Sequence, residues 1–512
     1  MKMLRSMTAT LAMLAFATLP VASASSQLRI EACTAGLGQP TAYEIRGGRT
    51  GFPFLLLTSF QRSNFPMSAI DPRDTRTLGV GLDLLALLVT APFDASGGSK
   101  FQLPIPNDTS LAGKALLHRV LSYPGTTTTF GEFSNVLVVP LDAAGSWRED
   151  ITKTMFNPRA WTSLIDEGDG NYLVAGGGSG ALLALVSVDT SDRFDLATRT
   201  FTQGPKMSVE RGVHTVSRLP GKKYLLAGGV DRLNDPQATC DLYDVSTQVF
   251  TSGAPMMDKR MAHSATELAD GRVFVAGGLN DMSTTQAALV SALASTEIYD
   301  PVTNKWTKGP DMGEGKAGHA ALRLPDGRVL LSGGLSWRSI FTVRVPTFSS
   351  VVEVYDPKNN TISRVNSMAS DRAGHAAVLL ASGKVLVAGG IGGSILVGGV
   401  ATAACELYDA ASGQWSATGS LPTAKALGAL VQLGDGSPAW IGGAAGSFLA
   451  PLPLDDCASY DVASAKWTSL PKLMTARATH VAAMSDSCAV FAIGGATGAS
   501  NAAVTTAETL IR

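Results

Sequence analysis

The sequence is poor in charged residues. They make up 16% of the 512 residues, and 41 Lys and Arg stand against 42 Asp and Glu, which leaves a formal net charge of −1. A protein that coats nucleic acid usually carries an excess of positive charge, so we expect no nucleic-acid partner. Hydrophobic residues make up 45%, which is too many for a disordered chain, and the composition therefore predicts a folded protein.

Long hydrophobic runs and paired cysteines are also scarce. The apolar run at 82–89 is far shorter than the roughly 20 residues that a membrane-spanning helix needs. The five cysteines contain no Cys-x-x-Cys pair, and their odd number leaves at least one thiol unpaired in a monomer, which excludes a disulfide-stapled scaffold. Three of them stand three residues before the Tyr of a Tyr-Asp pair, and we interpret them as small buried strand residues: Cys240, Cys405 and Cys457.

The first 24 residues have the features of an export signal. Lys2 and Arg5 precede an apolar stretch at 11–19, and residues 22–24 fit an A-x-A cleavage site. We therefore predict a signal peptide at 1–24 and a soluble protein, secreted or periplasmic, with no membrane span.

Glycine is abundant, and much of it lies in repeats. Seven of the 54 glycines begin a Gly-Gly doublet at the end of a short apolar run, at spacings of 49 to 56 residues. These first members are Gly176, Gly228, Gly277, Gly333, Gly389, Gly442 and Gly494. Five copies continue with Tyr-Asp and then a bulky residue, as in Tyr299-Asp300 followed by Trp306. Four short strands at a period near 50 predict a propeller blade, because one such sheet must stack on neighbours to bury its faces.

At these residues the chain resembles the kelch-repeat β-propellers of secreted bacterial type, with the Gly doublet, the Tyr and the Trp in that family's order. The resemblance covers roughly 147–512. It implies an all-β fold, with a seven-bladed kelch-type propeller at 146–512 after a small β-sandwich-like domain at 25–145. A WD-type propeller is the alternative fold, but no Trp-Asp pair occurs. The last copy stops before its fourth strand, and we predict that residues 145–148 supply it and close the ring.

The segment before the repeats lacks their period. Its strand-like runs at 52–57, 82–90 and 135–139 favour a small β-sandwich. The stretch 110–121 has two interpretations, a helix or part of a β-module that resembles one recurrent in secreted bacterial proteins. That resemblance implies surface attachment or carbohydrate contact, with a structural spacer as the alternative.

One face of the propeller is expected to carry the binding residues. In a blade with strands a to d, the b–c and d–a connections share one face, which we call the long-loop face. The b–c connections are long, above all the one at 335–351, and variable loops on a rigid scaffold concentrate binding residues. We predict ligand contacts from Trp337, Arg338, Phe341 and Arg344. The alternative for the two aromatic residues is that they only pack the loop onto its own blade.

A cation repeated in every copy reaches the same face. Four members, Arg211, Arg260, Arg372 and Arg477, are assigned to ligand binding, because a ring of cations could attract a carboxylate or sulfate. The alternative is structural, as pairing with the Asp of Tyr-Asp or capping of turn carbonyls. Five of the six histidines follow the cation by three residues. No histidine is therefore singled out as a general base, and we predict no catalytic residue, no metal and no cofactor.

These observations predict a monomeric, non-catalytic recognition or scaffold protein that binds a protein or glycan through the long-loop face. The alternative is a carbohydrate-active propeller enzyme, either galactose-oxidase-like or a sugar isomerase. Resemblance to the galactose-oxidase-like copper radical enzymes would imply a Cys cross-linked to a Tyr, a second Tyr and a pair of His.

Overall fold

The computed structural model describes residues 28–33, 40–47, 53–59, 91–104, 111, 114–122, 133–141, 145–150, 154–180, 184–395, 398–447, 450–498, 500 and 502–511. The predicted signal segment at 1–24 and the predicted strand at 82–90 lie outside these residues. The chain divides into two compact units, Met1–Asp142 and Ala143–Arg512. None of the described helices is long and apolar enough to cross a membrane.

The first unit contains two antiparallel sheets. Their strands are β1 (Arg29–Cys33), β2 (Pro40–Arg46) and β5 (Ser99–Pro104) in one sheet, and β4 (Ala91–Pro92), β3 (Pro53–Ser59), β6 (Lys114–Ser122) and β7 (Leu137–Leu141) in the other. Most of the stretch 110–121, for which the sequence allows a helix or a β-module, is strand β6. Apolar side chains of both sheets share one core. Buried His118 bridges the sheets, since its Nε2 lies 2.9 Å from the Tyr43 hydroxyl and its Nδ1 lies 2.8 Å from the Thr58 hydroxyl.

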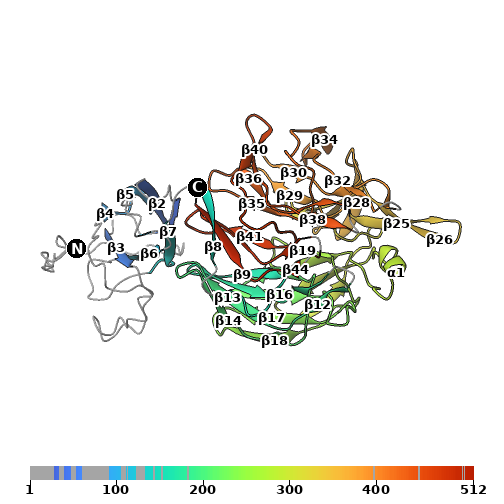
Figure 1. Ribbon diagram of the computed structural model, residues 1–512, viewed down its shortest axis with the longest axis horizontal. Helices are drawn as coiled ribbons and strands as arrows, with labels where there is room; N and C mark the ends of the chain where they lie inside the picture. Colours follow the sequence, from blue (N-terminus) through green and yellow to red (C-terminus); the bar gives the residue numbers. More distant parts are fainter. Residues whose placement is uncertain are drawn as a thin grey trace, which may run out of the picture. The chain divides into compact units, whose positions relative to one another are not determined.

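The second unit contains seven four-stranded antiparallel sheets among its described residues (Figure 1). In blade order the strands are β9 (Ser163–Gly168), β10 (Asn171–Ala175), β13 (Ser191–Asp195) and β14 (Thr200–Gln203); β15 (Thr215–Leu219), β16 (Lys223–Ala227), β17 (Cys240–Asp244) and β18 (Val249–Gly253); β19 (Ser264–Glu267), β20 (Val273–Ala276), β21 (Thr296–Asp300) and β22 (Lys305–Lys308); β23 (Ala320–Arg323), β24 (Val329–Ser332), β27 (Val352–Asp356) and β28 (Thr361–Val365); β29 (Ala376–Leu379), β30 (Lys384–Ala388), β33 (Cys405–Asp409) and β34 (Gln414–Ala417); β35 (Ala429–Gln432), β36 (Pro438–Ile441), β39 (Cys457–Asp461) and β40 (Lys466–Leu470); β41 (Val481–Met484), β42 (Val490–Ile493), β45 (Ala507–Ile511) and β8 (Ser146–Asp150).

The b–c connections add small elements of their own. These are α1 (Thr285–Leu289) and the hairpins β11 (Gly178–Ser179) with β12 (Val186–Ser187), β25 (Leu335–Ile340) with β26 (Val343–Phe348), β31 (Ile391–Gly392) with β32 (Val400–Ala401), β37 (Ala444–Gly446) with β38 (Pro451–Pro453), and β43 (Ala496–Thr497) with β44 (Ala502–Ala503).

The last blade is completed from the start of the unit. Strand β8 pairs antiparallel with β45, with Trp147 opposite Leu510. The Trp147 indole N–H also donates to the Pro471 carbonyl at 3.0 Å, which ties β8 to the preceding blade. Residues 146–150 therefore supply the missing fourth strand, and the predicted closure is confirmed. Pairing the two ends of the repeat region in one sheet closes the edge that each would otherwise expose.

The glycine doublets form the contacts between blades. In all seven, the second glycine donates its N–H to the backbone carbonyl of the repeated cation in the next blade, at 2.8–2.9 Å. The first glycine has a positive φ, and a Cβ there would lie 2.2–2.6 Å from that same carbonyl oxygen. Only glycine permits this approach and this backbone conformation. The repeat thus requires the doublet for packing between sheets.

A second ring of backbone hydrogen bonds runs once through every blade. The residue two positions after each cation has a left-handed φ, and its N–H donates to the carbonyl of its counterpart in the preceding blade at 2.8–3.2 Å. The seven residues are Trp161, Val213, Ala262, Gly318, Gly374, Leu427 and Thr479. The bond from Trp161 to Thr479 joins the first blade to the last, so this ring is closed.

Candidate functional site

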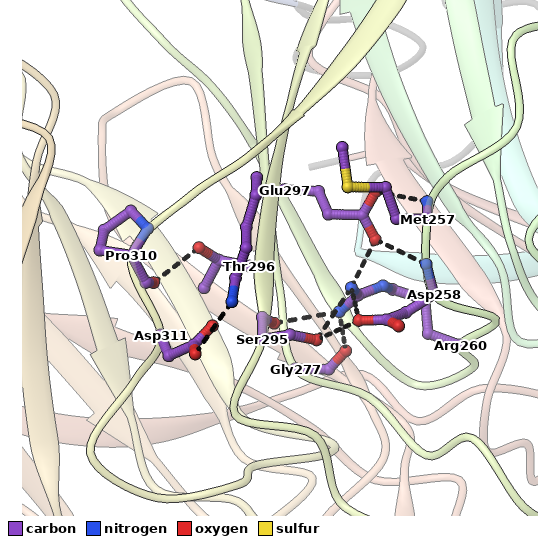
Figure 2. Close-up of polar contacts among 10 residues, drawn as sticks. Met257, Asp258, Arg260, Gly277, Ser295, Thr296, Glu297, Pro310 and Asp311 are labelled. Carbon is purple, nitrogen blue, oxygen red and sulfur yellow. Dashed lines mark hydrogen bonds and ion pairs between the residues drawn. The ribbon is translucent and has the colours of Figure 1, made fainter.

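The repeated cation is held inside its own blade by a buried clamp, which Figure 2 shows for Arg260. The Arg260 side chain is fully buried, and its Nη2 lies 2.7 Å from the Glu297 carboxylate on β21. Its Nη1 donates to the Gly277 carbonyl at 2.6 Å and to the Ser295 carbonyl at 3.2 Å. The clamp therefore joins the d–a connection, the glycine doublet and strand c.

The carboxylate of the clamp also positions the long-loop face. Glu297 accepts hydrogen bonds from the backbone N–H of Met257 at 2.7 Å and of Asp258 at 3.0 Å (Figure 2). Equivalent carboxylates cap the same part of the d–a connection in other blades, as Glu508 does for the N–H of Met474. The clamp thus fixes where these loops leave strand d.

All four arginines assigned to ligand binding occupy such clamps. Each is fully buried and pairs at 2.6–2.7 Å with an acid two residues before the Tyr position. The pairs are Arg211 with Asp241, Arg260 with Glu297, Arg372 with Glu406 and Arg477 with Glu508. Their guanidinium groups face blade interiors, where a bound anion would have to displace the acid.

The acid that pairs with the cation is not the Asp of Tyr-Asp. That Asp is the last residue of strand c and accepts from the backbone of the c–d turn instead. Asp244, for example, accepts from the Ser246 N–H at 2.8 Å, and this hydrogen bond lowers the pKa of its carboxyl group. The expected capping of carbonyls does occur, at the glycine doublet.

Blade six departs from this scheme. Ala458 occupies the position of the clamp acid, and Lys425 pairs with Asp456 at 2.7 Å instead. Gly428 stands where five other blades have histidine, and the Trp440 indole fills that space, since a Cβ on Gly428 would lie 2.1 Å from its Nε1. The blade compensates for both missing side chains with a nearby one.

Four of the five repeated histidines bond to the preceding blade. Nε2 of His214, His263, His319 and His375 lies 2.8–3.1 Å from a Ser or Thr hydroxyl of that blade. Burial lowers the pKa of His214 to about 3, so the imidazole is neutral at pH 7. These histidines hold blades together.

The four predicted ligand contacts lie on the hairpin 335–348, which we call the finger hairpin, and the structure places them in two different kinds of environment. The Trp337 N–H donates to the Ala292 carbonyl at 3.1 Å, and the Arg344 guanidinium lies 4.0 Å from the Trp337 ring centroid and donates to the Val290 carbonyl at 3.3 Å. Trp337 and Arg344 thus pack the finger hairpin onto the connection that carries α1. Arg338 and Phe341 are exposed, and Phe341 is 98% accessible.

Exposed apolar side chains gather on the long-loop face. Of the thirteen large hydrophobic residues exposed in the described part of the chain, ten lie on b–c or d–a connections. They are Phe156, Val186, Leu233, Met257, Ile340, Phe341, Val343, Val400, Leu452 and Met474. The opposite face holds Val249, Val302 and Val462. The periodic residues did not reveal this asymmetry, because it arises from connections that differ between blades.

A closed ring of four-stranded antiparallel sheets is a β-propeller. Residues 260–313, which include one clamp and its glycine doublet, match the family model of the Kelch motif. The chain is similar to the structure of a novel fungal alcohol oxidase of the AA5 family in complex with copper, with a TM-score of 0.54, 16% identity, and 72% of this chain and 76% of that chain covered. None of the curated proteins matches the chain significantly. The chain therefore contains a kelch-repeat β-propeller, and the likeness to the oxidase shows the fold alone.

The described residues do not fit a copper site. They contain no group of three or more His, Cys, Asp or Glu side chains placed to hold a metal ion. The Cys240 thiol faces the Ala238 carbonyl and burial raises its pKa to about 12, while the Tyr243 hydroxyl donates to Glu167. The Cys, Tyr and His side chains of the repeats thus serve contacts within and between blades.

Proposed function

We propose that this chain is an exported, non-catalytic recognition or scaffold protein that binds a protein partner through the long-loop face. The main support is the unequal number of exposed apolar side chains on the two faces of the propeller. Even without the finger hairpin, the long-loop face has seven such residues and the opposite face has three. Exposed apolar groups gathered on one face of a soluble protein are typical of an interaction surface.

The surroundings of these side chains favour a protein over a glycan. Ion pairs link d–a to b–c connections on this face: Lys206 with Asp189 at 3.0 Å, Lys259 with Asp235 at 2.9 Å, and Lys472 with Asp455 at 3.0 Å. Apolar contacts beside a charged rim are the composition of protein interfaces. A glycan site would need polar groups free to bond sugar hydroxyls, but the repeated Arg and acid side chains are engaged in clamps.

Export is part of the proposal. The basic and apolar segment at 1–24 with its A-x-A site supports it. Cys488 is disulfide-bonded, and structural disulfides persist in secreted and periplasmic proteins and are rare in reducing cytosol.

The test compares matched variants on the two faces. Leu233→Asp with Leu452→Asp changes the long-loop face, and Val302→Asp with Val462→Asp changes the opposite face with side chains of comparable exposure. A partner is captured from the exported fraction of the producing cells, purified, and its Kd measured against each variant. We expect at least tenfold weaker binding for the long-loop pair and no change for the control pair.

Three outcomes would contradict the proposal. Equal effects of the two variant pairs would show that binding does not prefer the long-loop face. Binding only to members of a glycan panel would show that the ligand is a glycan and not a protein. Copper-dependent peroxide production from a primary alcohol would establish the oxidase alternative.

A further inference from the structure

The finger hairpin ends in an apolar tip that nothing in the described structure covers. Phe341 is 98% exposed, Val343 is 61% exposed and Ile340 is 44% exposed. Figure 1 shows β25 and β26 extending past the four-stranded sheets beside α1. Because the hairpin projects past the sheets (Figure 1), its tip would enter another medium rather than receive a side chain.

The conformation of Phe341 adds a second observation. Phe341 is the first of two residues between β25 and β26, and its φ is 55°. In two-residue hairpin turns whose first central residue has a positive φ, glycine, asparagine and aspartate are the favoured residues at that position. A bulky aromatic residue there is a conformational outlier, and the exposed ring gains no packing in return. Such strain without local benefit points to a contact outside the molecule.

The charges behind the tip are of one sign. Arg338 and Arg344 lie on the two strands near the same level, since Arg338 pairs with Val345 and Arg344 with Ser339. Residues 335–348 contain no Asp or Glu. Each arginine stands three residues from Phe341, which is about 10 Å along a strand. That length matches the roughly 5–10 Å by which interfacial apolar groups enter a bilayer below the headgroups.

We propose that the finger hairpin binds an anionic lipid surface. Phe341, with Ile340 and Val343, enters the boundary between headgroups and acyl chains. Arg338 faces the lipid phosphates, and Arg344 adds a second positive charge while its guanidinium stays on the Trp337 ring. Trp337 and its bonds to the neighbouring connection hold the hairpin rigid, so little order is lost on insertion. The proposal is separate from the partner site, which uses residues outside the finger hairpin. An apolar tip with two cations suits a lipid surface, whereas a protein partner would need a pocket rimmed by acids.

The experiment uses the full chain and vesicle flotation. Vesicles of phosphatidylcholine with 30% phosphatidylglycerol are compared with pure phosphatidylcholine at low and at 0.5 M salt. We expect at least tenfold stronger binding to the anionic vesicles, and most of this difference should be lost at high salt. Phe341→Gly should reduce binding at least tenfold without lowering the melting temperature, because it relieves the turn. Val302→Ser, an exposed apolar change on the opposite face, is the control and should bind as the unchanged chain does.

Insertion has its own readout. Phe341→Trp should be quenched by lipids with brominated chains, and Arg338→Glu should weaken binding only to anionic vesicles. The proposal is overturned if no vesicle binds, if Phe341→Gly binds like the unchanged chain, or if brominated lipid leaves the Phe341→Trp fluorescence unchanged. Loss of a purified protein partner by Phe341→Gly, without vesicle binding, would assign the tip to that partner instead. Because the Leu233 and Leu452 variants test the partner site separately, either proposal can fail alone.

Discussion

Replacing Gly277 by alanine tests whether the glycine doublets hold the blades together. A Cβ there would lie 2.2 Å from the Lys316 carbonyl oxygen of the next blade, and φ is +65°. The left-handed conformation costs about 1 kcal/mol for alanine. Overpacking against backbone adds about 2 kcal/mol, and loss of the bond from Gly278 to Lys316 adds about 1 kcal/mol. We therefore expect Gly277→Ala to lower the unfolding free energy by about 4 kcal/mol.

The matched control is Gly327→Ala. Gly327 also has a positive φ, +90°, but a Cβ added there would have no neighbouring atom within 4 Å, so only the conformational cost of about 1 kcal/mol applies. With an unfolding entropy of about 2.1 cal/mol/K per residue over the propeller unit, the expected losses in melting temperature are about 5 °C for Gly277→Ala and about 1 °C for the control. Calorimetry on both variants makes the comparison. Equal losses would refute the claim that the doublet is required for contact between blades.

Three further predictions concern buried groups. Glu297→Gln leaves the buried Arg260 charge with only the partly exposed Asp258 carboxylate, 3.5 Å from its Nη2, as counter-charge, and urea unfolding should show a loss of about 3 kcal/mol. Burial lowers the folded pKa of His214 to about 3, below its unfolded value of about 6.5, so the stability that neutral His214 contributes is present above pH 6.5 and is lost as the pH falls. His214→Gln should therefore reduce the number of protons taken up on unfolding at pH 5 by about one. An unchanged proton uptake would contradict this. Iodoacetamide should label Cys240 in the denatured, unreduced chain but Cys488 only after reduction, as mass spectrometry would show.

The ring could be predicted because its signals are local and repeated. Glycine doublets, short apolar strands and the c–d turns each follow from a few neighbouring residues. Even the closure by residues 146–150 could be predicted, because the last copy lacks a fourth strand and Trp147 resembles Trp306 in its surroundings.

The clamp partners were harder to predict, although the sequence contains their signal. An Asp or Glu stands two residues before the Tyr position in six copies, and only Ala458 departs from it. The Asp after the Tyr is equally regular, so periodicity could not choose between the two. Strand geometry decides: the earlier acid lies within strand c, as Glu297 does within β21, while the later one ends the strand and enters the turn. Counting side chains along the strand would have distinguished them.

The exposure of individual loop residues could not be read from the sequence. Trp337 and Phe341 are both aromatic and stand four residues apart on the same connection, but one bonds to the neighbouring connection and the other is 98% exposed. That difference depends on the turn at Phe341 and on the segment carrying α1, which only the folded structure brings together. Residues that recur in every blade make contacts that every blade needs, and here they form the clamps and the hydrogen bonds between blades. The side chains that we propose for binding are therefore those that break the repeat, and Phe341 is one of them, because its conformation is unfavourable for the fold and its ring is exposed.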